Sequence, residues 1–101
     1  MFAQDAFARC PGDTQTEMNI CASADYKHAD TELTTAYHEL AQTPELIATE
    51  RAWIAYRDAE CAYEFGFYQG GSMAPMVYSM CMTRLTNERT AVLKMDATEG
   101  H

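Results

Sequence analysis

The chain has 101 residues, the length of a single domain, and 48% of them are hydrophobic, which is too apolar for a disordered tail. Fifteen acidic and seven basic side chains give a formal net charge of −8. This balance argues against nucleic acid or an anionic membrane surface as a partner, because both require clustered Lys and Arg. No apolar run approaches the roughly 20 residues of a transmembrane helix.

An N-terminal arm, residues 1–13, is expected to precede the first helix at residues 14–42. Thr14 and Glu17 form a Thr-x-x-Glu capping box, in which each side chain accepts a hydrogen bond from the backbone N–H of the other. After this box, apolar residues recur every three or four positions, which predicts one buried stripe along the helix. The stripe consists of Met18, Ala22, Tyr26, Ala29, Leu33, Tyr37 and Leu40.

The second helix is expected over residues 44–68. Thr43 is placed to cap it, and Pro44 suits the first helical turn, where no backbone N–H is needed. The pair Gly70-Gly71 ends the helical pattern. The predicted buried side of this helix is Leu46, Ile47, Trp53, Ile54, Arg57, Cys61, Phe65 and Tyr68.

The third helix is expected over residues 73–97. Ser72 is its predicted N-cap, and Pro75 is tolerated in its first turn. Short connections make consecutive helices antiparallel neighbours. The sequence therefore predicts one all-α domain, residues 1–101, built as a small disulfide-linked three-helix up-down-up bundle. The predicted buried side of the third helix is Val77, Cys81, Leu85, Val92 and Met95.

An even number of cysteines in so short a chain favours two disulfides and an oxidising compartment, with reduced core cysteines as the alternative. Three pairings are possible for Cys10, Cys21, Cys61 and Cys81. Cys61 and Cys81 lie at similar distances before and after the glycine break, so antiparallel helices bring them face to face. The arm can fold back to place Cys10 near Cys21. We therefore expect Cys10–Cys21 and Cys61–Cys81 disulfides.

A charged residue stands on the predicted buried side of the second helix. Trp53, Arg57 and Cys61 are spaced by four residues and share one helical face. A buried Arg57 requires a carboxylate partner, because an unpaired buried charge costs several kcal/mol. Asp30, on the stripe side of the first helix, is the expected partner. This pattern favours a structural ion pair in the core over a catalytic arginine.

No group of residues in the sequence is typical of an active site. Asp58, Glu60 and Glu64 lie on one helix, so they cannot face each other across a cleft as a pair of glycosidase carboxylates does. His28 and His38 provide two ligands, which are too few for a stable metal site. We therefore expect no catalytic residues, no metal and no cofactor.

The connection between the second and third helices is the predicted partner-binding feature. Gly70, Gly71 and Ser72 form a short turn, and Tyr68 and Met73 flank it with apolar surface. The expected second disulfide would brace this turn from behind. A rigid loop with apolar flanks is suited to present contacts to a protein partner.

The order of these motifs resembles the LprI-type lysozyme-inhibitor domain family of secreted bacterial proteins. The resemblance covers nearly the whole chain and combines the four cysteines with two continuous motifs. These motifs are Glu50-Arg51-Ala52-Trp53-Ile54-x-Tyr56-Arg57-Asp58-Ala59-x-Cys61 and Gly70-Gly71-Ser72.

The resemblance implies an exported, helical, disulfide-linked domain, so we expect a periplasmic or secreted protein whose leader is absent from this sequence. It also implies a protein partner, with a cationic lysozyme as the first candidate and inhibition as the function. The family has no catalytic residues to carry over. A second hypothesis is an envelope interaction module that uses the same surface, either as a homodimer or with a different secreted protein.

Overall fold

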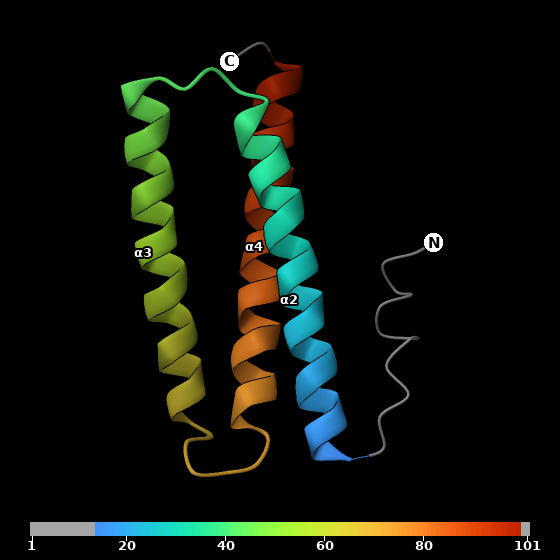
Figure 1. Cartoon of the computed structure of the whole chain (residues 1–101). Helices are drawn as coiled ribbons and strands as arrows, with labels where there is room; N and C mark the ends of the chain where they lie inside the picture. Colours follow the sequence, from blue (N-terminus) through green and yellow to red (C-terminus); the bar gives the residue numbers. More distant parts are fainter. Residues whose placement is uncertain (1–13, 100–101) are drawn as a thin grey trace.

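The computed structural model of the chain describes residues 14–99 and is all-α over this range. Its helices are α2 (Gln15–His38), α3 (Pro44–Gly66) and α4 (Ala74–Thr98), which run up, down and up (Figure 1). The predicted fold class is therefore confirmed, and the part of the chain that is described contains no strand. The expected arm, residues 1–13, lies outside the described residues.

The first two helices begin where the local sequence places their caps. Thr14 Oγ1 accepts a hydrogen bond from the Glu17 backbone N–H at 3.1 Å, and the Glu17 carboxylate accepts one from the Thr14 N–H at 3.3 Å. Thr43 Oγ1 accepts from the Leu46 N–H at 3.1 Å, with Pro44 in the first turn. Because these caps satisfy backbone donors within one turn of chain, sequence alone is enough to locate them.

The first helix ends earlier than expected. It was predicted to continue to about residue 42, but α2 ends at His38. The Gln42 side-chain amide turns back and donates to the carbonyl oxygens of Tyr37 and Leu40, each at 3.0 Å. A side chain from beyond the helix thus satisfies carbonyl groups near the helix end, which stabilises the early end.

The predicted N-cap of the third helix is wrong. Met73, rather than Ser72, occupies the N-cap position of α4, and no side chain caps this end. Met73 has right-handed helical φ and ψ of −92° and −1°, whereas a side-chain cap requires extended backbone. Ser72 contributes its carbonyl oxygen instead, which accepts a hydrogen bond from Asn19 Nδ2 at 3.2 Å.

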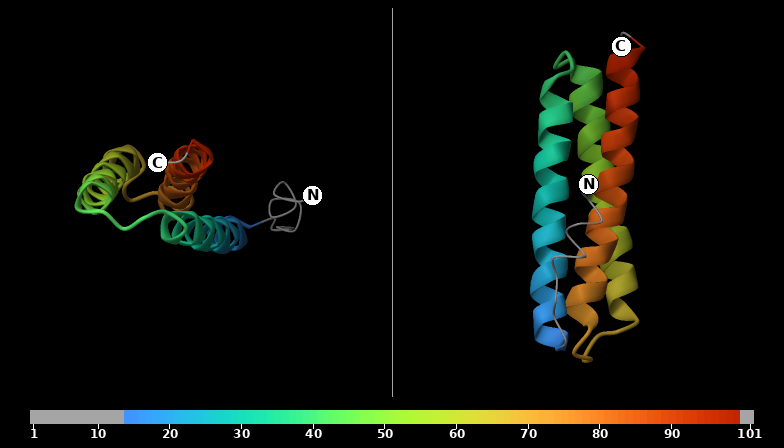
Figure 2. Two further views of the ribbon diagram at one scale, coloured as in Figure 1. Left: turned by 90° about the horizontal axis from the view of Figure 1, so that it is seen from above. Right: turned by 90° about the vertical axis from the view of Figure 1, so that its right-hand side faces the viewer.

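Helix α4 is the centre of the bundle, because α2 and α3 both pack on it. Within residues 14–99, α2 and α3 make no close backbone contact with each other. The view from above shows this arrangement, with α3 and α2 on two sides of α4 (Figure 2, left). The core accordingly follows α4.

Two apolar clusters form this core, and the half-buried Trp53 packs against both. The cluster toward the connection between α2 and α3 contains Leu33, Ala36, Leu40 and Leu93. The cluster toward the connection between α3 and α4 contains Cys61, Cys81, Met82 and Leu85.

The predicted buried side of the third helix needs a correction. Val92 and Met95 are exposed, whereas Leu93 is fully buried. Because α4 has neighbours on two sides, its buried surface is wider than one stripe and includes Thr86 and Thr90. Thr90 remains satisfied there, since its hydroxyl donates to the Thr86 carbonyl at 2.9 Å.

Candidate functional site

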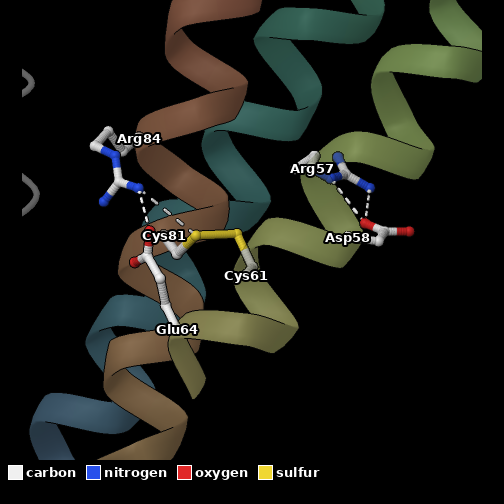
Figure 3. Close-up of a disulfide and its surroundings, with 6 residues drawn as sticks. All are labelled: Arg57, Asp58, Cys61, Glu64, Cys81 and Arg84. Atoms are coloured by element: carbon white, nitrogen blue, oxygen red, sulfur yellow. Dashed lines mark hydrogen bonds and ion pairs between the residues drawn. A yellow bond between two sulfur atoms is a disulfide. The ribbon is translucent and has the colours of Figure 1, made fainter. Parts of the chain in front are cut away.

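The expected disulfide between Cys61 and Cys81 is present and joins α3 to α4 (Figure 3). Both cysteines are buried in the core, with Cα atoms 5.6 Å apart. A second cross-link lies beside it, because Arg84 of α4 donates to the Glu64 carboxylate of α3 at 2.8 Å. The two helices are therefore fixed to each other a few residues before and after the loop that joins them.

The other predicted disulfide, Cys10–Cys21, remains a prediction. Cys10 lies outside the described residues. Cys21 lies on α2, is half-buried and is disulfide-bonded.

The loop that joins the two helices, residues 67–73, is called here the α3–α4 connection. Its backbone is held by turns, including a hydrogen bond from the Gly71 N–H to the Tyr68 carbonyl at 2.9 Å. Gly70 has a φ of +90°, which lies in the left-handed region that favours glycine. A Cβ atom on Gly71 would lie 3.2 Å from the Tyr68 carbonyl oxygen, which is a tight contact. The local backbone conformation therefore favours glycine at both positions.

The α3–α4 connection brings the predicted partner-binding residues together on the surface. Gly70, Gly71 and Ser72 are exposed, and the large side chains of Tyr68 and Met73 are 43% and 39% exposed. The hydrogen bond from α2 to the Ser72 carbonyl ties the loop to a third helix. The result is a short loop that presents apolar side chains and is anchored to all three helices.

Arg57 is buried in the core as expected, but the expected pairing with Asp30 is wrong. Arg57 is 8% exposed, and both its Nε and its Nη2 lie 3.0 Å from Oδ1 of Asp58, the next residue in the chain (Figure 3). The guanidinium carbon also lies 5.1 Å from the centre of the Trp53 ring and 5.8 Å from that of Tyr26.

These contacts explain how the charge is accommodated. The adjacent carboxylate and two aromatic faces surround the guanidinium, which leaves Asp30 exposed on α2. Burial raises the pKa of Tyr26, and the positive charge of Arg57 opposes this rise, so Tyr26 is neutral around Arg57 at physiological pH. Arg57 and Asp58 therefore form a structural ion pair.

An open groove of about 490 Å³ runs between α2 and α3, whose backbones make no close contact within residues 14–99. We call it the α2–α3 groove. Leu33 and Tyr37 line it from α2, and Ile47 and Ile54 line it from α3. Arg57 and Asp30 also reach it. Thr34, His38, Gln42, Glu50 and Arg51 complete the lining, so apolar side chains alternate with polar and charged ones in this groove.

A pair of exposed aromatic side chains lies where α3 meets the connection, with Tyr63 on the helix and Phe67 at its C-cap. The rings of Tyr63 and Phe67 meet edge to face with centroids 4.9 Å apart. Tyr63 was not among the predicted binding residues. Its i, i+4 spacing from Phe67 is visible in the sequence, but the exposure of both rings depends on how α3 packs on α4.

The carboxyl groups of Glu60 and Glu64 interact on the same helix. Their hydrogen bond raises the pKa of Glu60 above its ordinary value, and partial burial adds to the rise while Arg84 opposes it. His28 lies 3.7 Å from Glu32 on α2. Across residues 14–99, no three His, Cys, Asp or Glu side chains gather in a way that could hold a metal ion.

No helix among the described residues has the length and apolarity needed to cross a bilayer. No solved structure matches the chain. An uncharacterized protein of Rhizobium meliloti (strain 1021) is 38% identical in a match that covers 86% of this chain and 78% of that protein. The family model described as lysozyme inhibitor LprI matches residues 8–93. With a cysteine pair bridging α3 and α4, a buried Trp-Arg motif and this match, the chain belongs to the LprI lysozyme-inhibitor family.

Proposed function

We propose that this domain binds a lysozyme-type peptidoglycan hydrolase and blocks its substrate cleft, without catalysis of its own. The α3–α4 connection supports this proposal most directly. It presents Tyr68 and Met73 to solvent, and the Cys61–Cys81 disulfide links the two helices that it joins. A loop that is already rigid loses little conformational freedom on docking, so more of its contact energy contributes to affinity.

The charge of the chain supports the same kind of partner. A formal charge of −8 attracts a cationic enzyme over several ångströms and raises the association rate. Because salt screens this attraction, inhibition should weaken as ionic strength rises. The family name supports lysozyme as the enzyme class.

The proposed location is the periplasm or the medium outside the cell. Disulfides persist in oxidising compartments, and the Cys61–Cys81 pair is buried as a structural disulfide. Peptidoglycan hydrolases act in the same compartments, so the domain and its proposed partner would meet there.

A cell-wall lysis assay tests the proposal. Purified domain is added in increasing amounts to each member of a panel of lysozymes, at low and high salt, and the clearing of a cell-wall suspension is followed. We expect inhibition that increases with the amount of domain and weakens at high salt. If the domain inhibits no lysozyme of the panel, even at large molar excess, the proposed function is excluded.

A matched pair of variants locates the contact. Tyr68→Ala removes an exposed ring of the α3–α4 connection and should weaken inhibition about fivefold or more, which corresponds to roughly 1 kcal/mol at a moderately important contact. Met95→Ala removes an apolar side chain near the far end of α4 that is 59% exposed, and it should leave inhibition unchanged. Equal effects from both variants would argue against the loop.

A second candidate function is an envelope interaction module with a partner other than lysozyme, including a second copy of the chain. The apolar side chains in the lining of the α2–α3 groove favour it, since an open apolar surface is typical of a docking site. Sedimentation of the purified domain separates the two ideas, because a stable homodimer would be visible at micromolar concentration in the absence of any lysozyme.

A further inference from the structure

The outer side of α3 carries an unpartnered row of large aromatic side chains. Tyr56, Glu60, Tyr63 and Phe67 follow one another at intervals of four, three and four residues, so they form one line along the helix, which we call the outer stripe. Tyr63 and Phe67 are 65% and 68% exposed. Tyr56 is 55% exposed as well, so no helix within residues 14–99 covers the rings of the stripe.

Among residues 14–99, the carboxylates beside this stripe have one cation within reach. Glu60 and Glu64 lie one helical turn apart and interact through their carboxyl groups. Arg84 is the cation that reaches them, and it donates to Glu64 at 2.8 Å. Two carboxyl groups therefore share one positive charge, which leaves negative potential directly beside the rings of Tyr63 and Phe67.

We infer that the outer stripe receives an arginine side chain of a positively charged protein partner, with its guanidinium stacked on one ring of the Tyr63–Phe67 pair and hydrogen-bonded to Glu60. The inference rests on the proposed binding of a cationic hydrolase and adds a second contact beside the α3–α4 connection. A guanidinium suits the stripe because it is planar, stacks on aromatic rings and donates to carboxylates at the same time.

Charge distinguishes this occupant from the alternatives. A second copy of this acidic chain would bring its own carboxylates against Glu60 and Glu64, and like charges that face each other disfavour an interface. An anionic membrane would be repelled in the same way. An apolar partner surface would cover the rings but would leave the Glu60 carboxylate desolvated without a cation.

The stripe is tested first with a small probe that involves no lysozyme. The isotope-labelled domain is titrated with a blocked Arg-Gly-Arg peptide and, separately, with the peptide in which citrulline replaces both arginines. Citrulline keeps the shape of the side chain and removes its charge. We expect saturable amide chemical-shift changes concentrated at residues 60–67 with the arginine peptide, and none with citrulline. Identical responses to both peptides, or changes spread over all three helices, would overturn the inference.

Substitutions in the domain make the peptide test specific. Glu60→Gln removes the Glu60 charge but keeps the Arg84–Glu64 ion pair, and it should weaken peptide binding about threefold to tenfold. Glu39→Gln removes an exposed carboxylate at the far end of α2 and should change the affinity by less than about twofold. Thermal unfolding monitored by circular dichroism shows that each variant is folded before it is titrated.

The affinity for a lysozyme that the domain inhibits then shows whether the stripe contributes to the proposed function. Tyr63→Ala and Glu60→Gln should each raise the dissociation constant about fivefold to tenfold, and Met95→Ala should not. If lysozyme binds with the same affinity to the parent and to both stripe variants, the inference fails while the proposed function stands. If no lysozyme binds but the arginine peptide still shifts residues 60–67, the proposed function fails and the stripe remains a guanidinium site.

Discussion

Arg57 shows how a buried charge can be a structural element of a small core. Its guanidinium lies between the rings of Trp53 and Tyr26 and is paired with Asp58, and its side chain is 9% exposed. Removal of this side chain leaves a cavity between α2 and α3, and the two aromatic rings lose their contact with the guanidinium. Arg57 therefore stabilises the folded domain, and in this way it helps to maintain the shape of the domain.

Substitution of Arg57 should cost far more stability than substitution of its carboxylate partner. Arg57→Ala should lower the free energy of unfolding by about 2–4 kcal/mol. Asp58→Asn should lower it by less than about 1 kcal/mol, because the Asp58 side chain is 53% exposed and water screens the pair. Asp30→Asn should have no effect. Urea unfolding measures all three, and a large loss for Asp30→Asn would show that Asp30 is the true partner.

The carboxyl pair at Glu60 should make stability depend on pH. Its folded-state pKa is raised above the ordinary value of 4.5, mainly by the hydrogen bond to Glu64. A raised folded pKa means that the folded state holds the proton more tightly, so this contribution to stability is complete below the unfolded pKa and is lost as pH rises through the folded pKa. Glu60→Gln keeps a side chain that can form hydrogen bonds, but it removes the carboxyl group that titrates.

The measurement compares melting temperatures of Glu60→Gln and the parent domain near pH 4 and near pH 7. The melting temperature of the variant should increase relative to that of the parent as the pH rises, because only the parent must lose the proton. Glu39→Gln serves as the control, since its exposed carboxyl lies on another helix. A gain at low pH instead of high pH would contradict the assigned direction of the pKa shift.

At the scale of the helices, sequence predicts those features that depend on neighbouring residues. The caps at Thr14 and Thr43 and the break at Gly70 involve hydrogen bonds or dihedral angles within one turn of chain, and all three were predictable. The burial of Leu93 in place of Val92 was not, because it depends on the number of helices around α4. The early end of α2 was also missed, because the apolar stripe continues to Leu40 although the Gln42 side chain turns back onto carbonyl groups only two and five residues before it.

Two glycines near the end of α3 should respond in opposite ways to the same substitution. Gly70→Ala should lower the free energy of unfolding by about 1–2 kcal/mol, because alanine disfavours the positive φ of +90° at this position. Gly66→Ala should raise it by up to about 1 kcal/mol, because Gly66 is helical and a Cβ atom there meets nothing within 4 Å. Chemical denaturation of the two variants measures the difference. Equal changes would mean that the α3–α4 connection can relax, and it would then not be a rigid loop.

At the scale of the whole molecule, the three helices are not held equally. Helix α2 has the more extensive contact with α4, whereas α3 is joined to α4 by a smaller surface, the Cys61–Cys81 disulfide and two ion pairs, Glu64–Arg84 and Glu50–Arg89. The sequence predicted the disulfide and the order of the helices. It did not predict the gap between α2 and α3, because the pattern of apolar residues on one helix does not say which other helix covers it.

This asymmetry predicts which part of the domain opens first when the disulfide is removed. The double variant Cys61→Ala, Cys81→Ala should lose about 3 kcal/mol of stability, since the loop between these cysteines is then unconstrained in the unfolded chain. The loss should appear first in α3, because without the disulfide α3 is held by a smaller surface on α4 than α2 is. Native-state hydrogen exchange measures it residue by residue: amides of residues 50–66 should exchange faster than those of the α2 and α4 cores. The same variant should inhibit lysozyme less than the parent even where it remains folded, because the α3–α4 connection is no longer braced. Uniform acceleration across all three helices would instead mean that the domain unfolds as one unit and that the disulfide stabilises the bundle as a whole.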